Sequence, residues 1–512
     1  MLITESSQLA RDIAKHRNPV PLDGSKIPLV NPKIIQQPKL DHSQEEALSM
    51  AFTKPFAVIR GPAGSGKSTL AACLALNFVE KNRRTPRTDI KPQVLVCGPT
   101  EQTLNSIADY LKQCTTPLKI TRVYSEDIEQ KDFPTYGGHV MRSKMSAVMT
   151  DLALHHKIRG PSSQFSESIQ EQDMLLQLYP DDIDREQIDE YKATIMKAEV
   201  AELREADIIM CTCVTSARSR LRQNSNIAQI IIDDCNLCTE PESMTAIILN
   251  RNVQQVTLLG DSHGLKPVVY TRAARLLGLQ TSLMEPYIDK TIDLKLQYRM
   301  HDGISELSAE LFYKNFLFSH ASWQRGSPLL TFWPNKPVLF CQVQGQEEWI
   351  KDVDSAEKSL CNRNDANCTV NTVSSLLRHH NVAESNIVVL SPYLAQCQLI
   401  TKGLLQQGVS GVEVTTVLQG QGHQWDYVIV SLVRSLETSK IEKNPSPHWI
   451  RKYVGDIADS NQINIMLTRA RHGLVFVGNE DLLQVCPLWK IIINKLQNQG
   501  QIMASVDFLR LI

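Results

Sequence analysis

Short runs of apolar, often β-branched residues recur along the chain and alternate with stretches whose apolar positions follow a helical period. Nearly continuous runs of Val, Ile and Leu are typical of parallel strands that are covered by helices on both faces. The first set of runs covers 56–60, 93–98, 207–212, 229–234 and 255–261, and the second covers 386–391, 412–417, 427–432 and 474–479. The pattern therefore predicts an α/β fold with two parallel-sheet domains.

The expected domain organisation follows from these runs and from the length of 512 residues, which exceeds what one core usually holds. We expect an N-terminal extension over 1–39, a first domain over 40–295, a second domain over 296–495 and a C-terminal tail over 496–512. Residues 111–205 are charged and mainly helical in period, which predicts an insertion in the first domain. Residues 318–368 are rich in turn formers, which predicts an irregular surface connection.

Composition excludes some classes of protein. With 42% hydrophobic residues the chain can form sizeable cores, so global disorder is excluded. The 54 Lys and Arg against 55 Asp and Glu give a net charge of −1, so any nucleic-acid contact must be local. No signal peptide or run of about 18 apolar residues occurs, which argues against secretion and membrane contact. The twelve cysteines are typical of reduced intracellular thiols, in the cytoplasm or the nucleus.

The segment GPAGSGKST carries the spacing G-x-x-x-x-G-K-S between a strand-like run and a helical run. Its glycines allow backbone N–H groups to turn toward phosphate oxygens, and the helix that follows adds the positive end of its dipole. Lys67 is expected to reach the β- and γ-phosphates of a nucleotide, and the Ser68 hydroxyl is suited to Mg²⁺. The residues of this segment predicted to bind the nucleotide are Gly61, Gly64, Ser65, Gly66, Lys67, Ser68 and Thr69.

The segment IIIDDCNLCTEPES (230–243) allows three interpretations: half of a zinc site, a plain strand end, or an altered ATPase site. Cys235 and Cys238 have C-x-x-C spacing, but no second C-x-x-C or H-x₃₋₅-H follows at the spacing of a zinc ribbon or finger. Cys211 and Cys213 lie in a strand-like run, where alternate side chains share one face. Buried structural cysteines are therefore favoured over metal ligands.

The order of motifs decides between these interpretations, because it resembles that of Upf-type, 5′-to-3′ superfamily 1 helicases over about residues 40–495. LDHSQEEALSMA resembles their Q motif, GDSHGLKPVV motif III and LKLQYRMH motif IV, and VTTVLQGQGHQWDYVIVSLVRS and INIMLTRARHGLVFVGN follow in the family's order. IIMCTCVTSA and CPLW look closest to the C-terminal helicase module of interferon-responsive helicases with a zinc finger domain, which act as nuclear-receptor coactivators.

This resemblance implies an ATP-dependent RNA or DNA helicase, or a nucleic-acid-dependent ATPase, that hydrolyses Mg·ATP between two RecA-like domains. It implies that Gln44 reads adenine, that Asp233 supports Mg²⁺, and that Asp234 activates the attacking water. Arg299 and Arg469 match the family's two arginine fingers. Other residues that the resemblance places at the nucleotide are Asp261, Tyr298 and Gln424.

The expected partner is single-stranded RNA or DNA, and protein partners in transcription or RNA processing are possible by the same resemblance. Hydroxyl groups of Thr100, Thr212 and Thr416 would contact phosphates without reading bases. The arginines of RSRLR could add a salt-dependent contribution, or they could form a solvated helix face. These arginines are Arg218, Arg220 and Arg222.

The chain departs from the family pattern at the end of the strand that carries the family's D-E-A-x-Q motif. The family sequence D-E-A-x-Q is replaced by DDCNL, so Asp234 stands where the family has the catalytic glutamate and reaches about 1.5 Å less far. A misplacement of about 1 Å can cost about 100-fold in rate. Family polar groups are also replaced at Leu237, Gly264, Leu418, Gln424 and Glu101. The alternative function is therefore an ATP-binding helicase-like scaffold or transcriptional coactivator with little unwinding.

Overall fold

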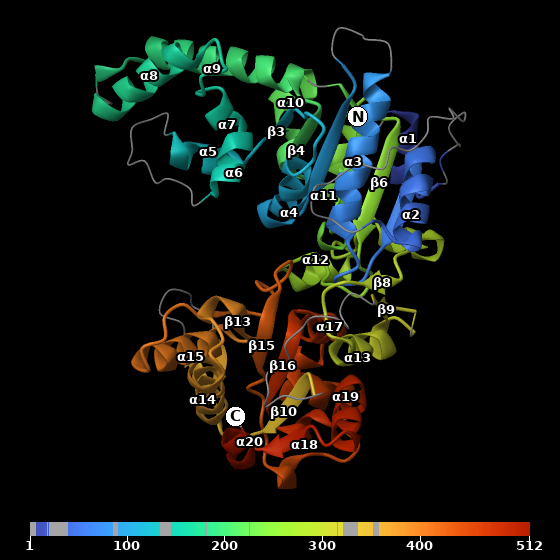
Figure 1. Ribbon diagram of the computed structural model, residues 1–512, viewed down its shortest axis with the longest axis vertical. Helices are drawn as coiled ribbons and strands as arrows, with labels where there is room; N and C mark the ends of the chain where they lie inside the picture. Colours follow the sequence, from blue (N-terminus) through green and yellow to red (C-terminus); the bar gives the residue numbers. More distant parts are fainter. Residues whose placement is uncertain are drawn as a thin grey trace. The chain divides into compact units, whose positions relative to one another are not determined.

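The computed structural model describes residues 7–17, 19, 39–84, 91–133, 145–179, 182–224, 226–314, 316–320, 336–351 and 358–511 (Figure 1). The chain divides into two compact units. Unit 1 comprises residues 1–61, 66–262 and 266–294, and unit 2 comprises 62–65, 263–265 and 295–512.

Unit 1 is built on a seven-stranded sheet with the order β3-β4-β2-β5-β6-β1-β7, in which every neighbouring pair is parallel. Its strands are β1 (Phe56–Arg60), β2 (Gln93–Gly98), β3 (Ile120–Arg122), β4 (Ile208–Thr212), β5 (Ile227–Ile232), β6 (Gln255–Gly260) and β7 (Ile292–Asp293). Successive side chains of a strand enter opposite faces. Ala57 and Ile59 accordingly pack into one core of unit 1 and Val58 into the other.

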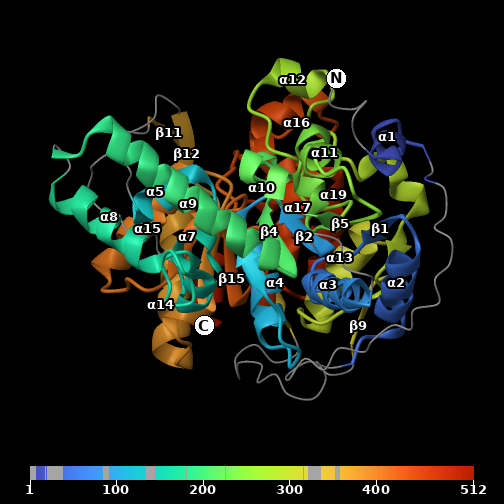
Figure 2. The ribbon, with the colours of Figure 1, turned by 90° about the horizontal axis from the view of Figure 1, so that it is seen from above.

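Helices cover both faces of this sheet (Figures 1 and 2), as the nearly continuous apolar runs predict. One face packs against α2 (His42–Thr53), α3 (Lys67–Arg83) and α4 (Glu101–Lys112). The other face packs against α1 (Gln8–Ala14), α9 (Arg185–Glu205) and α11 (Glu240–Ile248). Two shorter helices of unit 1 are α10 (Ser219–Asn224) and α12 (Arg272–Leu276).

The described residues within 111–205 are mainly helical, as their period predicts, but they also supply the edge strand β3. The helices of this insertion are α5 (Glu126–Asp132), α6 (Ala147–Leu152), α7 (Leu154–Lys157), α8 (Ser166–Leu178) and the long α9. β3 has three residues, all of them buried, and so short a run leaves no period in the sequence that would distinguish it from a turn.

Unit 2 contains a six-stranded parallel sheet with the order β14-β13-β15-β16-β10-β17. Its strands are β10 (Val338–Gln342), β13 (Ile387–Ser391), β14 (Glu413–Thr416), β15 (Trp425–Ser431), β16 (Ala470–Gly478) and β17 (Ile502–Ala504). The expectation of an irregular connection over 318–368 is wrong at β10, where four successive residues are buried inside the sheet. The apolar run of β10 directly follows Pro334, Asn335 and Pro337, so the surrounding turn formers hide it in the sequence.

Helices α14 (Arg363–His380), α15 (Leu394–Gln406) and α20 (Ser505–Leu511) pack on one face of the unit 2 sheet. On the other side, Trp489 of α19 (Pro487–Asn498) packs edge-on against Phe476 of β16, with ring centroids 5.3 Å apart. The remaining helices of unit 2 are α13 (Asp302–Phe312), α16 (Pro447–Tyr453), α17 (Ser460–Thr468) and α18 (Glu480–Leu483). Short paired strands complete the unit: β8 (Leu296–Gln297) with β9 (Phe318–Ser319), and β11 (Glu347–Lys351) with β12 (Lys358–Asn362).

All twelve cysteines are free thiols and every one except Cys114 is buried, so the burial expected for the C-x-x-C and C-x-C cysteines is found. Cys213 and Cys238 place their sulfur atoms 3.7 Å apart in a core of unit 1. Among the described helices, none combines the length and apolar character needed to cross a bilayer.

Candidate functional site

The phosphate-binding segment forms the turn between β1 and α3. Gly64 and Gly66 have φ angles of +78° and +81°, a left-handed region that only glycine adopts without strain. Gly66 is the residue that precedes α3, so the helix begins directly after the turn with Lys67. Ser65 closes the turn, because its hydroxyl donates to the carbonyl oxygen of Pro62 at 2.8 Å. The segment thus has the backbone form that a phosphate-binding loop requires.

Two polar side chains project from the start of α3. The Lys67 Nζ donates to the carbonyl oxygen of Gly61 at 2.8 Å, and the Ser68 Oγ donates to Asp233 Oδ2 at 2.8 Å. Thr69 follows in the same helical turn and is half-buried. Ser68 and Asp233 are 165 residues apart in sequence, so the parallel pairing of the sheet is what brings them together.

Asp233 has the electrostatic setting of a cation ligand. It is fully buried directly after β5, and burial together with the neighbouring Asp234 carboxylate raises its pKa to about 7, against the effects of Lys67 and the Ser68 hydroxyl. A divalent cation would favour the ionised carboxylate. Carboxylate and hydroxyl oxygens are the donors that Mg²⁺ prefers, so the residues present fit this ion.

Asp234 lies in the left-handed region, with φ 49° and ψ 39°, and its N–H donates to Asp233 Oδ1 at 3.0 Å. Aspartate is one of the few non-glycine residues enriched in this conformation. Its side chain is half-buried rather than sealed in the core. The backbone therefore turns sharply at the position where the family has its catalytic glutamate.

Asn236 is a site residue that sequence reasoning missed. Its Oδ1 accepts the N–H of Asp261 at 3.0 Å, which joins the turn after β5 to the end of β6. An asparagine three positions after the first aspartate of the strand end was the available signal. Leu237, which follows, has no polar side-chain group with which to sense a phosphate.

Gln44 lies beside the phosphate-binding turn. A Cβ atom at Gly66 would come 2.5 Å from the Gln44 Nε2, so the amide occupies the space that only glycine leaves open. Gln44 is held by Asp41 in a capping box at the start of α2, with both hydrogen bonds at 3.0 Å. The helix cap thus positions the residue that the resemblance assigns to adenine.

Within unit 2, Arg299 and Arg469 meet at one residue. The Arg299 Nη1 donates to the carbonyl oxygen of Thr468 at 3.1 Å, and the Arg469 Nη2 donates to the Thr468 hydroxyl at 3.2 Å. The Gln297 side chain, also missed from the sequence, accepts the backbone N–H of Arg299 at 2.9 Å. The structure therefore brings together two arginines that are 170 positions apart in the sequence.

Two further predicted residues lie near these arginines in the fold of unit 2. The Arg469 Nη1 donates at 3.2 Å to the carbonyl oxygen of His423, and the next residue is the exposed Gln424. The ring of Tyr298, adjacent to Arg299, lies 4.8 Å from the ring of His320. Tyr298 thus already has an aromatic neighbour within its own unit.

The threonines expected at nucleic acid stand at or just beyond the carboxyl ends of strands, where each organises the next turn. Thr100 caps α4, accepting from the N–H of Thr103, and the Thr416 hydroxyl accepts the N–H of Gln419 at 3.3 Å. The Thr212 hydroxyl donates to Thr215 at 2.8 Å. These positions place the hydroxyls at one edge of each sheet.

Arg218 and Arg220 form ion pairs with buried or half-buried glutamates, so they do not form the solvated helix face, and the phosphate contact stays a prediction. Arg218 pairs with Glu129 at 2.7 Å, and Arg220 pairs with Glu199, whose side chain is 2% exposed. The side chain of Arg222 lies outside the described part. The sequence missed these pairs because both glutamates belong to the helical insertion.

Comparison with known proteins matches residues 39–272 to an AAA domain and residues 278–481 to a second AAA domain. The 3'-5' exoribonuclease HELZ2 of Mus musculus is 32% identical over 490 residues, covering 91% of this chain and 16% of that protein. The regulator of nonsense transcripts 1 homolog of Arabidopsis thaliana is 31% identical over 467 residues, covering 88% of this chain and 33% of that protein.

The chain thus spans less than two thirds of the length of these relatives. A solved complex of the Arterivirus nonstructural protein 10 (helicase) with DNA matches with a TM-score of 0.36 at 11% identity, covering 87% of this chain and 65% of that one. The two matched domains together contain every strand of both sheets except β17, and they include the phosphate-binding turn. The chain belongs to the Upf1-like family of superfamily 1 helicases.

Proposed function

We propose that this chain binds Mg·ATP through unit 1 and hydrolyses it in a nucleic-acid-dependent reaction, as an ATP-dependent helicase does. The observation that carries the proposal is the contact between Ser68 and Asp233, 2.8 Å apart directly beside the phosphate-binding turn. A hydroxyl and a buried carboxylate in this place are the two protein ligands that Mg·nucleotide sites of this class use.

Ser68 and Asp233 would hold the Mg²⁺, which when bound supplies positive charge to the phosphate oxygens. Lys67 would exchange its contact with the Gly61 carbonyl for the β- and γ-phosphates. Gln44 would select adenine from its place against Gly66. Binding therefore uses residues of one turn, one helix cap and one strand end.

Hydrolysis would require Asp234 to orient the attacking water and Arg299 and Arg469 to stabilise charge on the transferred phosphoryl group. The shorter Asp234 side chain reaches the water less well than glutamate would, so we expect slow turnover. RNA is the favoured strand, because relatives of the chain are named as an exoribonuclease and as a regulator of nonsense transcripts. We place the protein inside the cell, in line with its abundance of cysteines in strand-like runs.

The second candidate is an ATP-binding scaffold or transcriptional coactivator that hydrolyses little ATP. The observation that favours it is the strand end itself, where Asp234 is short and Leu237 is apolar. In that case Lys67, Ser68 and Asp233 would still bind the nucleotide. Fewer polar groups would remain to couple its hydrolysis to a nucleic-acid strand.

ATP hydrolysis by the purified chain, with and without single-stranded RNA or DNA, separates the two functions. The wild type should hydrolyse ATP faster with a strand present, and Lys67→Ala should lose both activity and ATP affinity. Asp234→Glu, which restores the longer carboxylate in a backbone conformation that glutamate adopts less readily, should raise kcat. Asp234→Asn is the matched control, since it keeps the size and the turn but removes the charge.

The scaffold is supported if the wild type binds ATP, shows no strand-stimulated hydrolysis, and gains activity only as Asp234→Glu. The enzyme is supported if wild-type hydrolysis disappears in both Lys67→Ala and Asp234→Asn. A wild-type chain that fails to bind Mg·ATP would contradict both candidates.

A further inference from the structure

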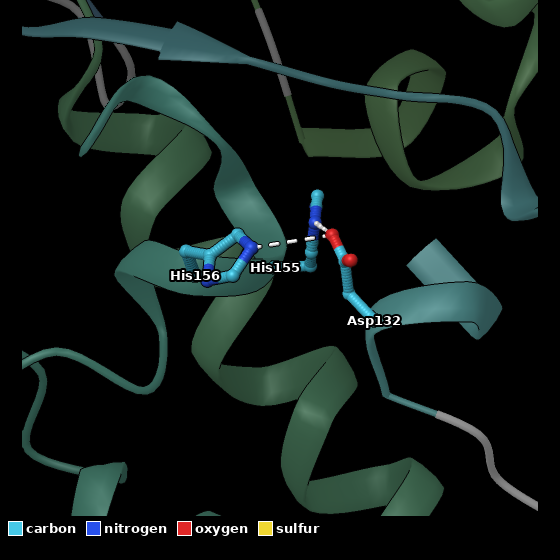
Figure 3. Close-up of side chains that lie close together, drawn as sticks. All are labelled: Asp132, His155 and His156. Carbon is cyan, nitrogen blue, oxygen red and sulfur yellow. Dashed lines mark hydrogen bonds and ion pairs between the residues drawn. The ribbon is translucent and has the colours of Figure 1, made fainter. Parts of the chain in front are cut away.

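Two imidazoles and a carboxylate converge inside the helical insertion of unit 1. Asp132 is the last residue of α5, and His155 and His156 are adjacent residues of α7. Figure 3 shows both rings directed at the same carboxylate. The Nε2 of His155 lies 3.1 Å from Asp132 Oδ2, and the Nε2 of His156 lies 3.3 Å from the same oxygen.

The local fold explains the convergence. Adjacent residues of a helix normally diverge by about 100°, so two neighbouring histidines meet one group only if it lies between them. α7 is held in place because Ala153, which precedes it, bridges to Arg122 of β3. The Phe133 ring packs edge-on against His156 at 5.1 Å, which positions the imidazole from the side of α5.

Two side chains of the cluster are buried, and the third is partly accessible to solvent. The side chains of Asp132 and His155 are 4% and 3% exposed, whereas that of His156 is 27% exposed. Burial lowers the pKa of His155 to about 4, despite the Asp132 carboxylate, so this ring is neutral at neutral pH. Neutral imidazole is the form that binds metal ions. The nearby Arg159 is paired with Asp173 at 2.6 Å, which offsets its charge.

We propose that Asp132, His155 and His156 bind one Zn²⁺ ion. Tetrahedral ligands at 2.0–2.1 Å from zinc lie about 3.3 Å from one another, close to the separations of 3.1 and 3.3 Å found here. All three ligand atoms lie within 4.8 Å of one another. Two nitrogens and one oxygen suit zinc, whereas Mg²⁺ and Ca²⁺ prefer oxygen donors throughout.

Protons compete with the ion for this site, because the same distances suit hydrogen bonds from protonated Nε2 atoms to the carboxylate. Zinc binding therefore requires each Nε2 to present its lone pair, with the proton of the neutral ring carried on Nδ1 instead.

Zinc would link two helices that are joined by a long stretch of chain. The liganding residues are 23 and 24 positions apart in the sequence, and a metal that closes such a loop stabilises the folded insertion. Three protein ligands leave a fourth position for water. His155 and Phe133 also line a cavity of about 350 Å³, which offers space for that water and a route of entry.

Zinc content tests the proposal on the full chain, purified without a polyhistidine tag and dialysed against zinc. Metal analysis should find about one Zn²⁺ per chain. His156→Gln and Asp132→Asn should each weaken binding at least 10-fold in a titration against a chromophoric chelator. Two control variants should bind zinc as tightly as the wild type. Ser68→Ala removes a ligand of the proposed Mg²⁺ site, and His379→Gln changes an exposed histidine in the last turn of α14.

Cobalt provides a second readout that identifies the ligands. Co²⁺ in the site should give visible d–d absorption without the near-ultraviolet charge-transfer band of thiolate ligands, which excludes the buried cysteines. The proposal is overturned if the wild type holds no more zinc than His156→Gln, or if the cobalt spectrum shows thiolate ligation. If both site variants unfold, the test is thermal unfolding of the wild type with and without a chelator. The midpoint of unfolding should fall when the chelator removes zinc. An unchanged midpoint overturns the proposal.

Discussion

Glu101 illustrates at the scale of one residue why this chain departs from its family. The resemblance expects asparagine at this position. In the structure the Glu101 carboxylate accepts from Arg122 at 2.9 Å, and the Arg122 side chain is fully buried. A buried guanidinium requires a charged partner. The glutamate therefore stabilises the fold at a position where the family has asparagine.

We expect Glu101→Gln to lower the free energy of unfolding by about 3 kcal/mol, because it leaves the Arg122 charge buried without compensation. Chemical denaturation measures the loss. Glu80→Gln is the matched control, since Glu80 pairs with Arg83 at the surface and should change stability by less than about 1 kcal/mol. Equal losses in the two variants would contradict this account.

Asp365 is a second residue whose role only the fold reveals. Val433 has a φ angle of +69°, which strains a β-branched residue, and its N–H donates to Asp365 Oδ2 at 2.9 Å. The Asn362 amide donates to the Val433 carbonyl at 3.1 Å. Asp365 in the first turn of α14 and Asn362, which caps that helix, therefore hold the strained turn that follows β15. Burial raises the pKa of Asp365 well above its usual value.

This shift predicts a pH dependence of stability. Above the ordinary aspartate pKa of 3.8 the unfolded state has released the Asp365 proton while the folded state retains it, so stability falls as pH rises toward the folded pKa. Asp365→Asn keeps an acceptor for Val433 and removes the titration. Unfolding free energies measured from pH 5 to pH 8 should decline less steeply in the variant, and parallel curves would contradict the prediction.

At the scale of elements, α14 and α15 pack closely because one of them carries a glycine. A Cβ atom at Gly403 in α15 would come 2.9 Å from Val370 Cγ2 in α14. Glycine costs a helix about 1 kcal/mol relative to alanine. The close approach of the two helices is therefore maintained at the expense of helix propensity.

We expect Gly403→Ala to destabilise unit 2 by about 1 kcal/mol, because overpacking outweighs the gain in helix propensity. In the background of Val370→Ala the same change should instead stabilise by about 1 kcal/mol. A double-mutant cycle of unfolding free energies measures this reversal. Lys402→Ala, which changes an exposed neighbour, should alter the free energy of unfolding equally in both backgrounds. If the effect of Gly403→Ala does not depend on residue 370, the packing argument is contradicted.

At the scale of the whole molecule, the proposed binding and hydrolysis of ATP draw on different units. Lys67, Ser68 and Asp233 belong to unit 1, whereas Arg299 and Arg469 belong to unit 2 and share Thr468 as a partner. ATP binding and ATP hydrolysis should therefore be separable by mutation. The net charge of −1 leaves nucleic-acid binding to local groups rather than to a general field.

Arg469→Lys should lower kcat at least about 100-fold while the affinity for ATP changes less than about threefold, because lysine keeps the charge but not the planar fork of donors. Arg299→Lys should act in the same direction. Stopped-assay kinetics and nucleotide titration measure the two quantities. Arg378→Lys, an exposed arginine of α14, is the control. A parallel loss of ATP binding in Arg469→Lys would contradict the separation of roles.

The sequence predicted those parts of the fold that local patterns encode. The apolar runs gave nine strands of the two sheets to within a few residues, and the glycine spacing predicted the turn before α3. It missed β3, β7, β10 and β17. β3, β7 and β17 have only two or three residues each, and β10 follows a stretch rich in turn formers. It assigned Asp233 and Asp234 to a strand, whereas β5 ends at Ile232 and the two aspartates form the turn beyond it.

The sequence by itself determined the family and predicted the residues that would hold a nucleotide, because both depend on spacings of a few residues along one turn and one strand end. Only the tertiary structure decided which polar groups meet across long separations. Arg218 and Arg220 appear available from the sequence, yet the insertion supplies their glutamates. No spacing in the sequence connects Asp132 with His155 and His156, which α7 brings to it in the fold. Long-range partners follow from how helices and strands pack, and no local pattern records that packing.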